Sequence, residues 1–236
     1  MTALGLTAFA LVLSFATYLV ATRIARLFDF NPLVNPVVIA VVLIIVVLKL
    51  SDISYQSYFK GAEAIHFLLG PATVALAIPL AKQAARLRQL LLPLSLSLVL
   101  GCATSIVSAF TITTAFHGSL PLAISMAPKS ATTPIAMAVT QTLHGYPAVS
   151  AAVVITTGIV GAIVGRFVFR FLGVDAIEAR GFALGVSAHG IGTARAFQIS
   201  PELGAYAGLG MGLNGILTAV MTPILVPILT QILYRA

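Results

Sequence analysis

Long apolar segments, separated by short polar ones, follow one another along almost the whole chain. A helix needs about 20 apolar residues to cross the hydrocarbon core of a bilayer. On that length the pattern predicts six spans, at about residues 3–22, 33–50, 64–81, 89–115, 147–171 and 203–234. The run from Val37 to Leu48 does not alternate apolar and polar residues, as the strands of a membrane barrel do. The sequence therefore predicts an all-α polytopic membrane protein.

Two further apolar segments, at about 119–143 and 176–200, are interrupted by polar stretches that contain glycine and proline. The stretches run from Pro128 to Pro134 (PKSATTP) and from His189 to Arg195 (HGIGTAR). Irregular backbone is tolerated at membrane depth only where protein or a water-filled cavity surrounds it. Paired interruptions in the two halves of a membrane protein point to the substrate site of a transporter. We therefore expect both segments to be broken, re-entrant helical hairpins.

The composition excludes a soluble globular protein. Apolar residues make up 59% of the 236 residues and charged residues only 8%, whereas soluble domains carry about 25% charged residues. The net charge of +7 comes from scattered basic residues, which the positive-inside bias of membrane proteins explains better than nucleic-acid binding does. We expect a multi-pass membrane protein with no nucleic-acid partner.

The basic residues also predict the orientation of the spans. The strongest cluster lies between the third and fourth predicted spans and places that loop in the cytoplasm (Lys82, Arg86 and Arg88). Arg166 and Arg170 face the cytoplasm only if segment 119–143 enters and leaves the membrane on one side. The charge pattern thus favours a re-entrant hairpin over a full crossing, and it predicts both termini outside.

A weak internal repeat supports the same topology. Thr133–Ala136 matches Thr193–Ala196 at a period of 60 residues. Each copy would hold one hairpin and one span, an odd number of crossings, so the two copies would be inverted, as in many transporters. The predicted organisation is a scaffold of four spans in residues 1–115 and an inverted-repeat, substrate-binding region in residues 116–236.

Polar side chains in the first interruption are candidates for an anion site. The prolines at its two ends disfavour helix, so the chain between them is predicted to be unwound. Ser130, Thr132 and Thr133 can pair the freed backbone groups or cap the following half-helix, whose positive end attracts an anion. Lys129 adds a full positive charge, although it could instead snorkel to the surface from a shallower hairpin.

The second interruption carries a comparable set of groups. Gly190 and Gly192 relax the backbone, and Thr193 can cap a half-helix. Arg195 offers a planar fork that suits a carboxylate, with a structural pairing to Glu202 or a backbone carbonyl as the alternative. The sequence therefore predicts positive groups at both interruptions.

A histidine and an asparagine complete the predicted site. His189 is explained equally well by packing, and an amide at membrane depth, such as Asn214, often hydrogen-bonds a neighbouring helix. The predicted substrate-binding residues are Lys129, Ser130, Thr132, Thr133, His189, Thr193, Arg195 and Asn214.

Acidic residues are confined to predicted span ends and loops (Asp29, Asp52, Glu63, Asp175, Glu178 and Glu202). No carboxylate is therefore expected at mid-membrane to bind a cation or relay protons, which argues against a cation pump. The sequence also has no metal-ligand cluster and no paired nucleophile and base, so we expect no metal, no cofactor and no enzymatic activity.

Three segments resemble the LrgB/CidB family. They are Leu68–Ala77 (LLGPATVALA), Pro128–Ala136 (PKSATTPIA) and Ala179–Ala196, which ends in HGIGTARA. The resemblance covers nearly the whole chain. Ala131 and Gly190 depart from it, since valine and alanine are expected there, but neither change removes a polar group.

This resemblance implies two kinds of function. Bacterial members are antiholin-like or holin-like proteins of the plasma (inner) membrane that modulate murein hydrolase activity and autolysis, beside a small LrgA/CidA-type membrane partner. A plastid relative, similar to the two partners fused, carries glycolate and glycerate, and some bacterial pairs are linked to pyruvate uptake. With the two interruptions, the resemblance favours a small-monocarboxylate transporter that works by alternating access, as a homo- or hetero-oligomer. The alternative is a holin-like or antiholin-like modulator of autolysis.

Overall fold

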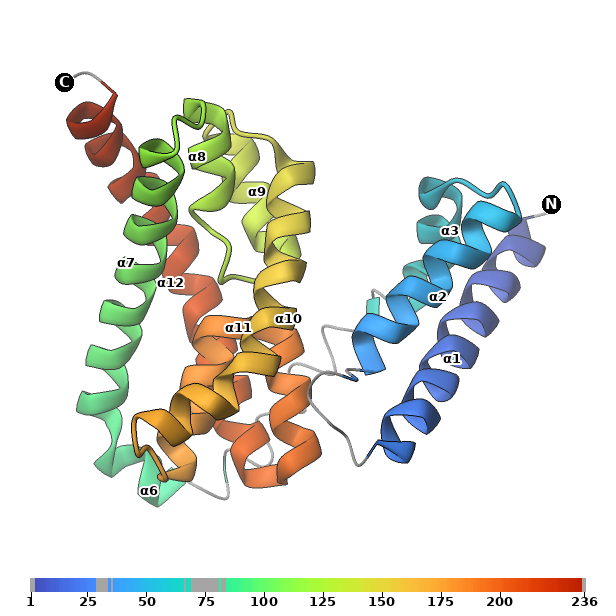
Figure 1. Cartoon of the computed structure of the whole chain (residues 1–236), viewed down its shortest axis with the longest axis horizontal. Coiled ribbons are helices and arrows are strands. Elements are labelled where there is room, and N and C mark those ends of the chain that lie inside the picture. The colour runs from blue at the N-terminus through green and yellow to red at the C-terminus, as the bar shows by residue number, and fades with distance from the viewer. Residues whose placement is uncertain are drawn as a thin grey trace. The chain divides into compact units, whose positions relative to one another are not determined.

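The computed structural model describes residues 3–28, 34, 36–65, 67–68, 81 and 84–234, and every regular element in these residues is a helix. The chain divides into two compact units, residues 1–75 and 76–236 (Figure 1). Among the described residues, four helices are long and apolar enough to cross a membrane, or five if one bent pair counts as a span. The predicted all-α, multi-pass membrane class is confirmed.

The N-terminal unit consists of α1 (Ala3–Leu27), α2 (Pro36–Leu50) and α3 (Tyr55–Gly61). Helix α1 corresponds to the first predicted span, whereas α2 has only 15 residues and is followed by α3 at a bend of 117°. A Cβ atom at Gly61 would lie 2.6 Å from the carbonyl oxygen of Leu6, so glycine permits the close contact of α3 with α1. The third predicted span, 64–81, and the segment Leu68–Ala77 lie largely outside the described residues.

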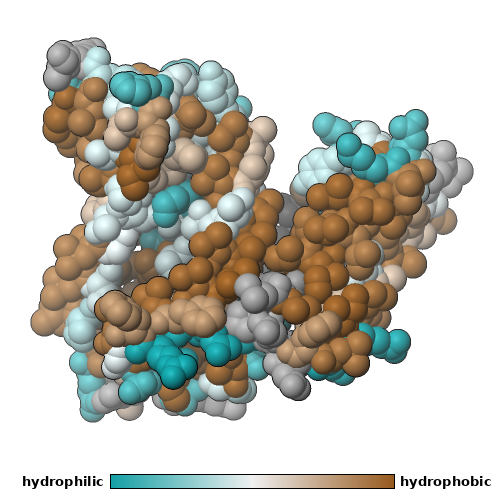
Figure 2. Space-filling model, in the orientation of Figure 1, coloured by the Kyte–Doolittle hydropathy of each residue, from teal (hydrophilic) through white to brown (hydrophobic). Residues whose placement is uncertain are grey.

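The C-terminal unit contains the remaining predicted spans and both interrupted segments. Its helices are α6 (Ala84–Gln89), α7 (Leu91–Ala115), α8 (Leu120–Met126), α9 (Thr133–Thr142), α10 (Pro147–Phe171), α11 (Ile177–Ile199) and α12 (Pro201–Leu233). Helices α7, α10 and α12 have the length and hydropathy of membrane spans. Many of their large apolar side chains are exposed, as expected of surfaces that face lipid, and Figure 2 shows this surface in brown.

Helices α8 and α9 form a hairpin whose two outer ends lie at the same end of the C-terminal unit (Figure 1). With 7 and 10 residues, neither helix can cross a bilayer, and the chain turns back between them at 127–132. The backbone N–H of Tyr146, just before α10, donates to Ser125 Oγ of α8 at 2.7 Å. Helix α10 therefore begins beside α8 and not at the opposite end of the unit.

Helix α11 is also a hairpin, because it bends back at His189, where the backbone is not helical (φ 41°, ψ −131°). Before the bend, α11 runs parallel to the part of α12 that it contacts (Gly181 with Leu203, Gly185 with Ala207). After the bend, it runs antiparallel to the same part of α12 (Thr193 with Met211, Phe197 with Gly204). Helix α10 crosses the whole unit between the two hairpins. The second hairpin therefore enters from the end opposite to the first (Figure 1).

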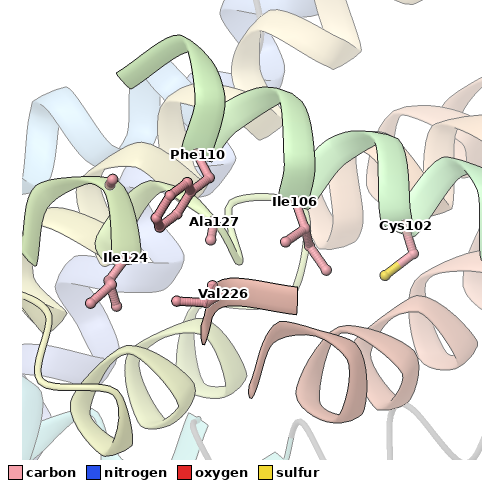
Figure 3. Packing of buried hydrophobic residues seen from close by; sticks show 7 residues of the cluster. Cys102, Ile106, Phe110, Ile124, Ala127 and Val226 are labelled. Carbon is pink, nitrogen blue, oxygen red and sulfur yellow. The ribbon is translucent and has the colours of Figure 1, made fainter. Parts of the chain in front are cut away.

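An apolar core joins α7 to the first hairpin and to α12. Residues at helical spacing on one face of α7 pack against side chains of α8, the following turn and α12 (Cys102, Ile106 and Phe110 with Ile124, Ala127 and Val226; Figure 3). At the same end of the unit, the hydroxyl of Tyr234 donates to the carbonyl oxygen of Gly118 at 2.7 Å. These contacts close the end of the unit from which the first hairpin enters.

The starts of the helices do not keep one constant repeat spacing, and the compact units divide at another residue than the predicted domains do. Helices α10 and α12 begin at Pro147 and Pro201, 54 residues apart, so the 60-residue period of Thr133–Ala136 and Thr193–Ala196 does not extend to the starts of the following spans. The spacing is not constant because four residues, 143–146, join α9 to α10, whereas Ser200 alone separates α11 from α12. The compact units divide at 75/76, whereas the predicted boundary at 115/116 concerns which helices move together and stays a prediction.

Cysteine labelling tests the first hairpin. In a Cys102→Ser background, Ser119→Cys and His144→Cys flank α8 and α9, and both should react with a membrane-impermeant thiol reagent added to the same side. Phe171→Cys, at the other end of α10, should react only from the opposite side. Labelling of positions 119 and 144 from opposite sides would show a full crossing instead.

Candidate anion-binding site

The first interruption is a non-helical turn inside the C-terminal unit. Two short hydrogen-bonded turns hold its backbone, from the N–H of Lys129 to Met126 O (3.2 Å) and from the N–H of Ala131 to Pro128 O (3.0 Å). Pro128 contributes no N–H, so the α8 ladder cannot continue through it. The unwinding predicted for this stretch is therefore present, and Ser130 within it is only 5% exposed.

Lys129 reaches from this turn to helix α7. Its Nζ donates to Ser105 Oγ at 3.2 Å, and the same Oγ lies 2.7 Å from Ser130 Oγ. Three polar side chains from two separate elements thus form one hydrogen-bonded group. Ser105 is not among the predicted site residues, because it is one of several hydroxyl residues in an apolar span and no local pattern distinguishes it.

Lys129, Ser105 and Ser130 line a cavity of about 1250 Å³ between α7, α10 and the first half of α11. The wall is mostly apolar, with a few further hydroxyls (Ser97, Thr104, Thr156, Thr157 and Ser187). Figure 2 shows a hollow between α7 and α10 in which white to teal residues interrupt the brown surface. Leu90 and Leu172 line the cavity near the end where α10 stops, so Lys129 lies at its inner end, roughly halfway along α7.

The group around Lys129 is rich in hydrogen-bond donors. One ammonium and two hydroxyls carry five donor hydrogens, and the two hydrogen bonds use two of them, which leaves three. Within the described part of the C-terminal unit, no carboxylate forms an ion pair with Lys129. Glu178 lines the same cavity but lies in the first turn of α11, near the mouth. An ammonium that is partly removed from water and lacks a counter-ion favours a bound anion.

Asn214 on α12 connects the two interruptions. Its Nδ2 donates to the carbonyl oxygen of Ser130 (3.0 Å) and to that of Val186 (3.1 Å), three residues before the bend in α11. Breaks in a helix free such carbonyls from the backbone ladder. Asn214 is fully buried and is not among the residues that line the cavity, and its amide forms a bridge between helices.

His189 is 5% exposed and packs against α10. Its Nε2 lies 2.8 Å from the carbonyl oxygen of Val154, which can only accept, so Nε2 carries the hydrogen. A Cβ atom at Gly158 would lie 2.6 Å from the imidazole Cε1, so the glycine makes room for the ring. The backbone break predicted for Gly190 and Gly192 is instead centred on His189, which has the positive φ.

The threonines of the two interruptions take the predicted cap position in one case and pair a freed backbone group in the other. Thr132 holds the N-cap position of α9, directly before Thr133, but its side chain makes no capping bond. Thr193 Oγ1 donates to the carbonyl oxygen of His189 at 2.8 Å, within the helix that follows the bend. This bond serves the same need as a cap, because it pairs a backbone group that the bend has freed.

Arg195 does not line the cavity that contains Lys129. It is half-buried on the returning part of α11, and its Nη1 donates to Gln198 Oε1 at 3.1 Å. The predicted residues that the structure brings together are therefore Lys129, Ser130 and, through its bridge, Asn214. Thr132, Thr133, His189, Thr193 and Arg195 are not among the residues that line the cavity.

Comparisons with known proteins agree with one another. Residues 14–228 match the sequence model of the LrgB-like family. The uncharacterized protein YwbG of Bacillus subtilis (strain 168) is 35% identical over 202 residues, which cover 86% of this chain and 89% of YwbG. The holin-like proteins CidB of Staphylococcus epidermidis (strain ATCC 12228 / FDA PCI 1200) and Staphylococcus aureus (strain N315) are 33% and 32% identical over 206 residues, 87% of this chain and 90% of each relative. No solved structure matches the chain.

The bridge made by Asn214 predicts a loss of stability when the amide is removed. Asn214→Ala leaves two buried carbonyls without their donor, at a cost of about 1–3 kcal/mol each, which corresponds to a midpoint of thermal unfolding lowered by roughly 4–24 °C. Gln231→Ala, on an exposed position of the same helix, is the matched control and should leave the midpoint unchanged. Equal midpoints for the two variants would contradict the bridging role.

Proposed function

The chain belongs to the LrgB-like family, and we propose that it is a membrane carrier of small monocarboxylates that binds them at Lys129. The supporting observation is a lysine ammonium at the inner end of a membrane-embedded cavity, with no carboxylate ion-paired to it within the described part of the C-terminal unit. Removing a charge from water costs several kcal/mol unless an opposite charge or several hydrogen bonds offset the loss. A small organic anion in the cavity would supply that charge.

The substrate class follows from the site and from the family resemblance together. Two remaining N–H groups of Lys129 can hold the two oxygens of one carboxylate, and the apolar wall favours a small molecule with a single charge. Glycolate, glycerate and pyruvate are the candidates. Their common feature is one carboxylate on a chain of two or three carbons.

Alternating access is the proposed mechanism, and the two hairpins are its proposed inverted repeat. In both copies the first half-helix runs parallel to the following span and the second runs antiparallel to it. The cavity reaches the end of the unit at which α10 stops. The positive-inside rule predicts that this end is cytoplasmic, so in this proposal the conformation is the inward-facing one. Opening to the outside would separate the contacts at the other end, which include Tyr234 with Gly118.

Several further features belong to the same proposal. Arg195 and the polar groups of the second hairpin do not line the present cavity. In this proposal they would contact the anion in another state of the transport cycle. The protein would lie in the bacterial plasma membrane with both termini outside. It would act as a homo- or hetero-oligomer, beside a small LrgA/CidA-type membrane partner, and without a cofactor.

A holin-like role is the second candidate, and the relatives favour it. The CidB proteins of two staphylococci carry the name holin-like, and they are 32–33% identical to this chain over most of its length. Such a role would modulate murein hydrolases and autolysis through the membrane. It gives no reason for a lysine at the inner end of a cavity, and for that reason we place it second.

Uptake into proteoliposomes separates the two candidates. Wild-type protein, with and without an LrgA-type partner, should give saturable uptake of labelled glycolate, glycerate or pyruvate. Lys129→Gln should raise KM at least about tenfold, because it removes the only full positive charge that lines the cavity among the described residues. Arg195→Gln tests the second hairpin in the same assay.

Lys49→Gln, on an exposed lysine of α2, is the matched control and should transport as the wild type does. Release of a trapped dye is measured on the same vesicles. Dye leakage without saturable uptake in any pairing would refute the carrier and support the holin-like role.

A further inference from the structure

We infer that Ser105 is a specificity-determining residue, which positions Lys129 and forms with Ser130 a hydroxyl pair that binds an oxygen on C2 of the transported acid. This inference rests on the proposed carrier function and extends it to a residue of α7. It concerns the part of the substrate beside the carboxylate. It therefore predicts discrimination between acids of equal charge and similar size.

The hydrogen bonds among Lys129, Ser105 and Ser130 determine how many donors remain for a substrate. The Lys129 ammonium donates to Ser105 Oγ, and Ser105 and Ser130 share one hydroxyl hydrogen between their oxygens. Whichever hydroxyl donates in that pair, one hydroxyl hydrogen remains, and neither serine side chain has another hydrogen-bond partner among the described residues. The site thus offers two ammonium N–H groups and one O–H group.

The number of acceptor oxygens on the substrate determines whether all of these remaining donors are paired. A carboxylate alone occupies the two ammonium N–H groups and leaves the hydroxyl hydrogen unpaired in a partly buried site. An acid with a hydroxyl or keto oxygen on C2 supplies the third acceptor within the reach of the same group. Sites built to hydrogen-bond a substrate oxygen discriminate strongly against analogues that lack it, because the protein group is then left without a partner.

Ser105 lies on a different element from Lys129, and this position allows it to fix the orientation of the lysine side chain. Lys129 and Ser130 both belong to the turn of the first hairpin, so they would move together with it. Ser105 lies on α7, a continuous 25-residue helix, and is the partner that fixes the ammonium toward the cavity. Loss of the Ser105 hydroxyl should therefore free the lysine side chain and also remove one half of the pair.

Uptake kinetics with paired substrates test the inference. Glycolate is compared with acetate, and lactate with propionate, since each pair differs in the C2 oxygen alone. The wild type should prefer the oxygenated acid, and Ser105→Ala should lower the ratio of kcat/KM within each pair by about tenfold, the value of one hydrogen bond of moderate strength. Ser105→Thr keeps the hydroxyl and should retain most of the preference.

Ser95→Ala is the matched control. Ser95 is an exposed serine of the same helix and is not among the residues that line the cavity. Its ratio should equal that of the wild type. Ser130→Ala removes the other hydroxyl of the pair, the one on the hairpin. If the two hydroxyls act as one unit, the double variant Ser105→Ala/Ser130→Ala should lose little more of the substrate preference than either single variant.

Two results would overturn the inference in different ways. Active uptake with an unchanged ratio in Ser105→Ala and in Ser130→Ala would refute it and leave the carrier function intact. Absence of saturable uptake by the wild type would refute the carrier and this inference together. If Ser105→Ala does not fold, the ratio measured for Ser130→Ala decides.

Discussion

Backbone groups left without partners at membrane depth are the constraint on which the C-terminal unit depends. The bilayer offers no water to an unpaired carbonyl or N–H, so each break in a helix must be paired within the protein. The chain breaks twice, at 127–132 and at His189. At each break the pairing comes from short backbone turns or a neighbouring hydroxyl, and from the amide of Asn214 on another element. The packing of the unit follows from where those side chains lie.

The pairing is reciprocal between the hairpins and the spans. Asn214, on the span of the second half, donates to the first break and to the first part of α11, whereas His189, in the second break, donates to α10 of the first half. Each hairpin is therefore tied to the span that follows the other one. Such crossed hydrogen bonds hold the two breaks near one another inside the membrane, where a substrate site can use the exposed donors.

The position of its cation relative to the cavity distinguishes the first break from the second. Lys129 faces a cavity and makes its hydrogen bond to a neutral hydroxyl, whereas Arg195 is half-buried outside that cavity beside Gln198. The proposed carrier function accounts for the first arrangement by placing a bound anion beside Lys129. The names of the staphylococcal relatives describe a holin-like protein, and a carrier whose activity changes the state of the cell envelope would be consistent with both observations.

The sequence by itself determined the class of the protein, four of its long helices and the presence of a break in each of the two interrupted segments. These features are local: apolar length sets a span, and Pro128 ends α8 because it lacks an N–H. Tertiary structure alone decided that Ser105 meets Lys129, that Asn214 bridges two breaks and that Arg195 lies apart. Which faces of two helices meet depends on the packing of the whole unit, and residues such as Ser105 and Ser130, 25 positions apart, carry no mark of it in the sequence. The bend at His189 instead of Gly190 has the same origin, because the imidazole is held by Val154 and by the space that Gly158 leaves on α10.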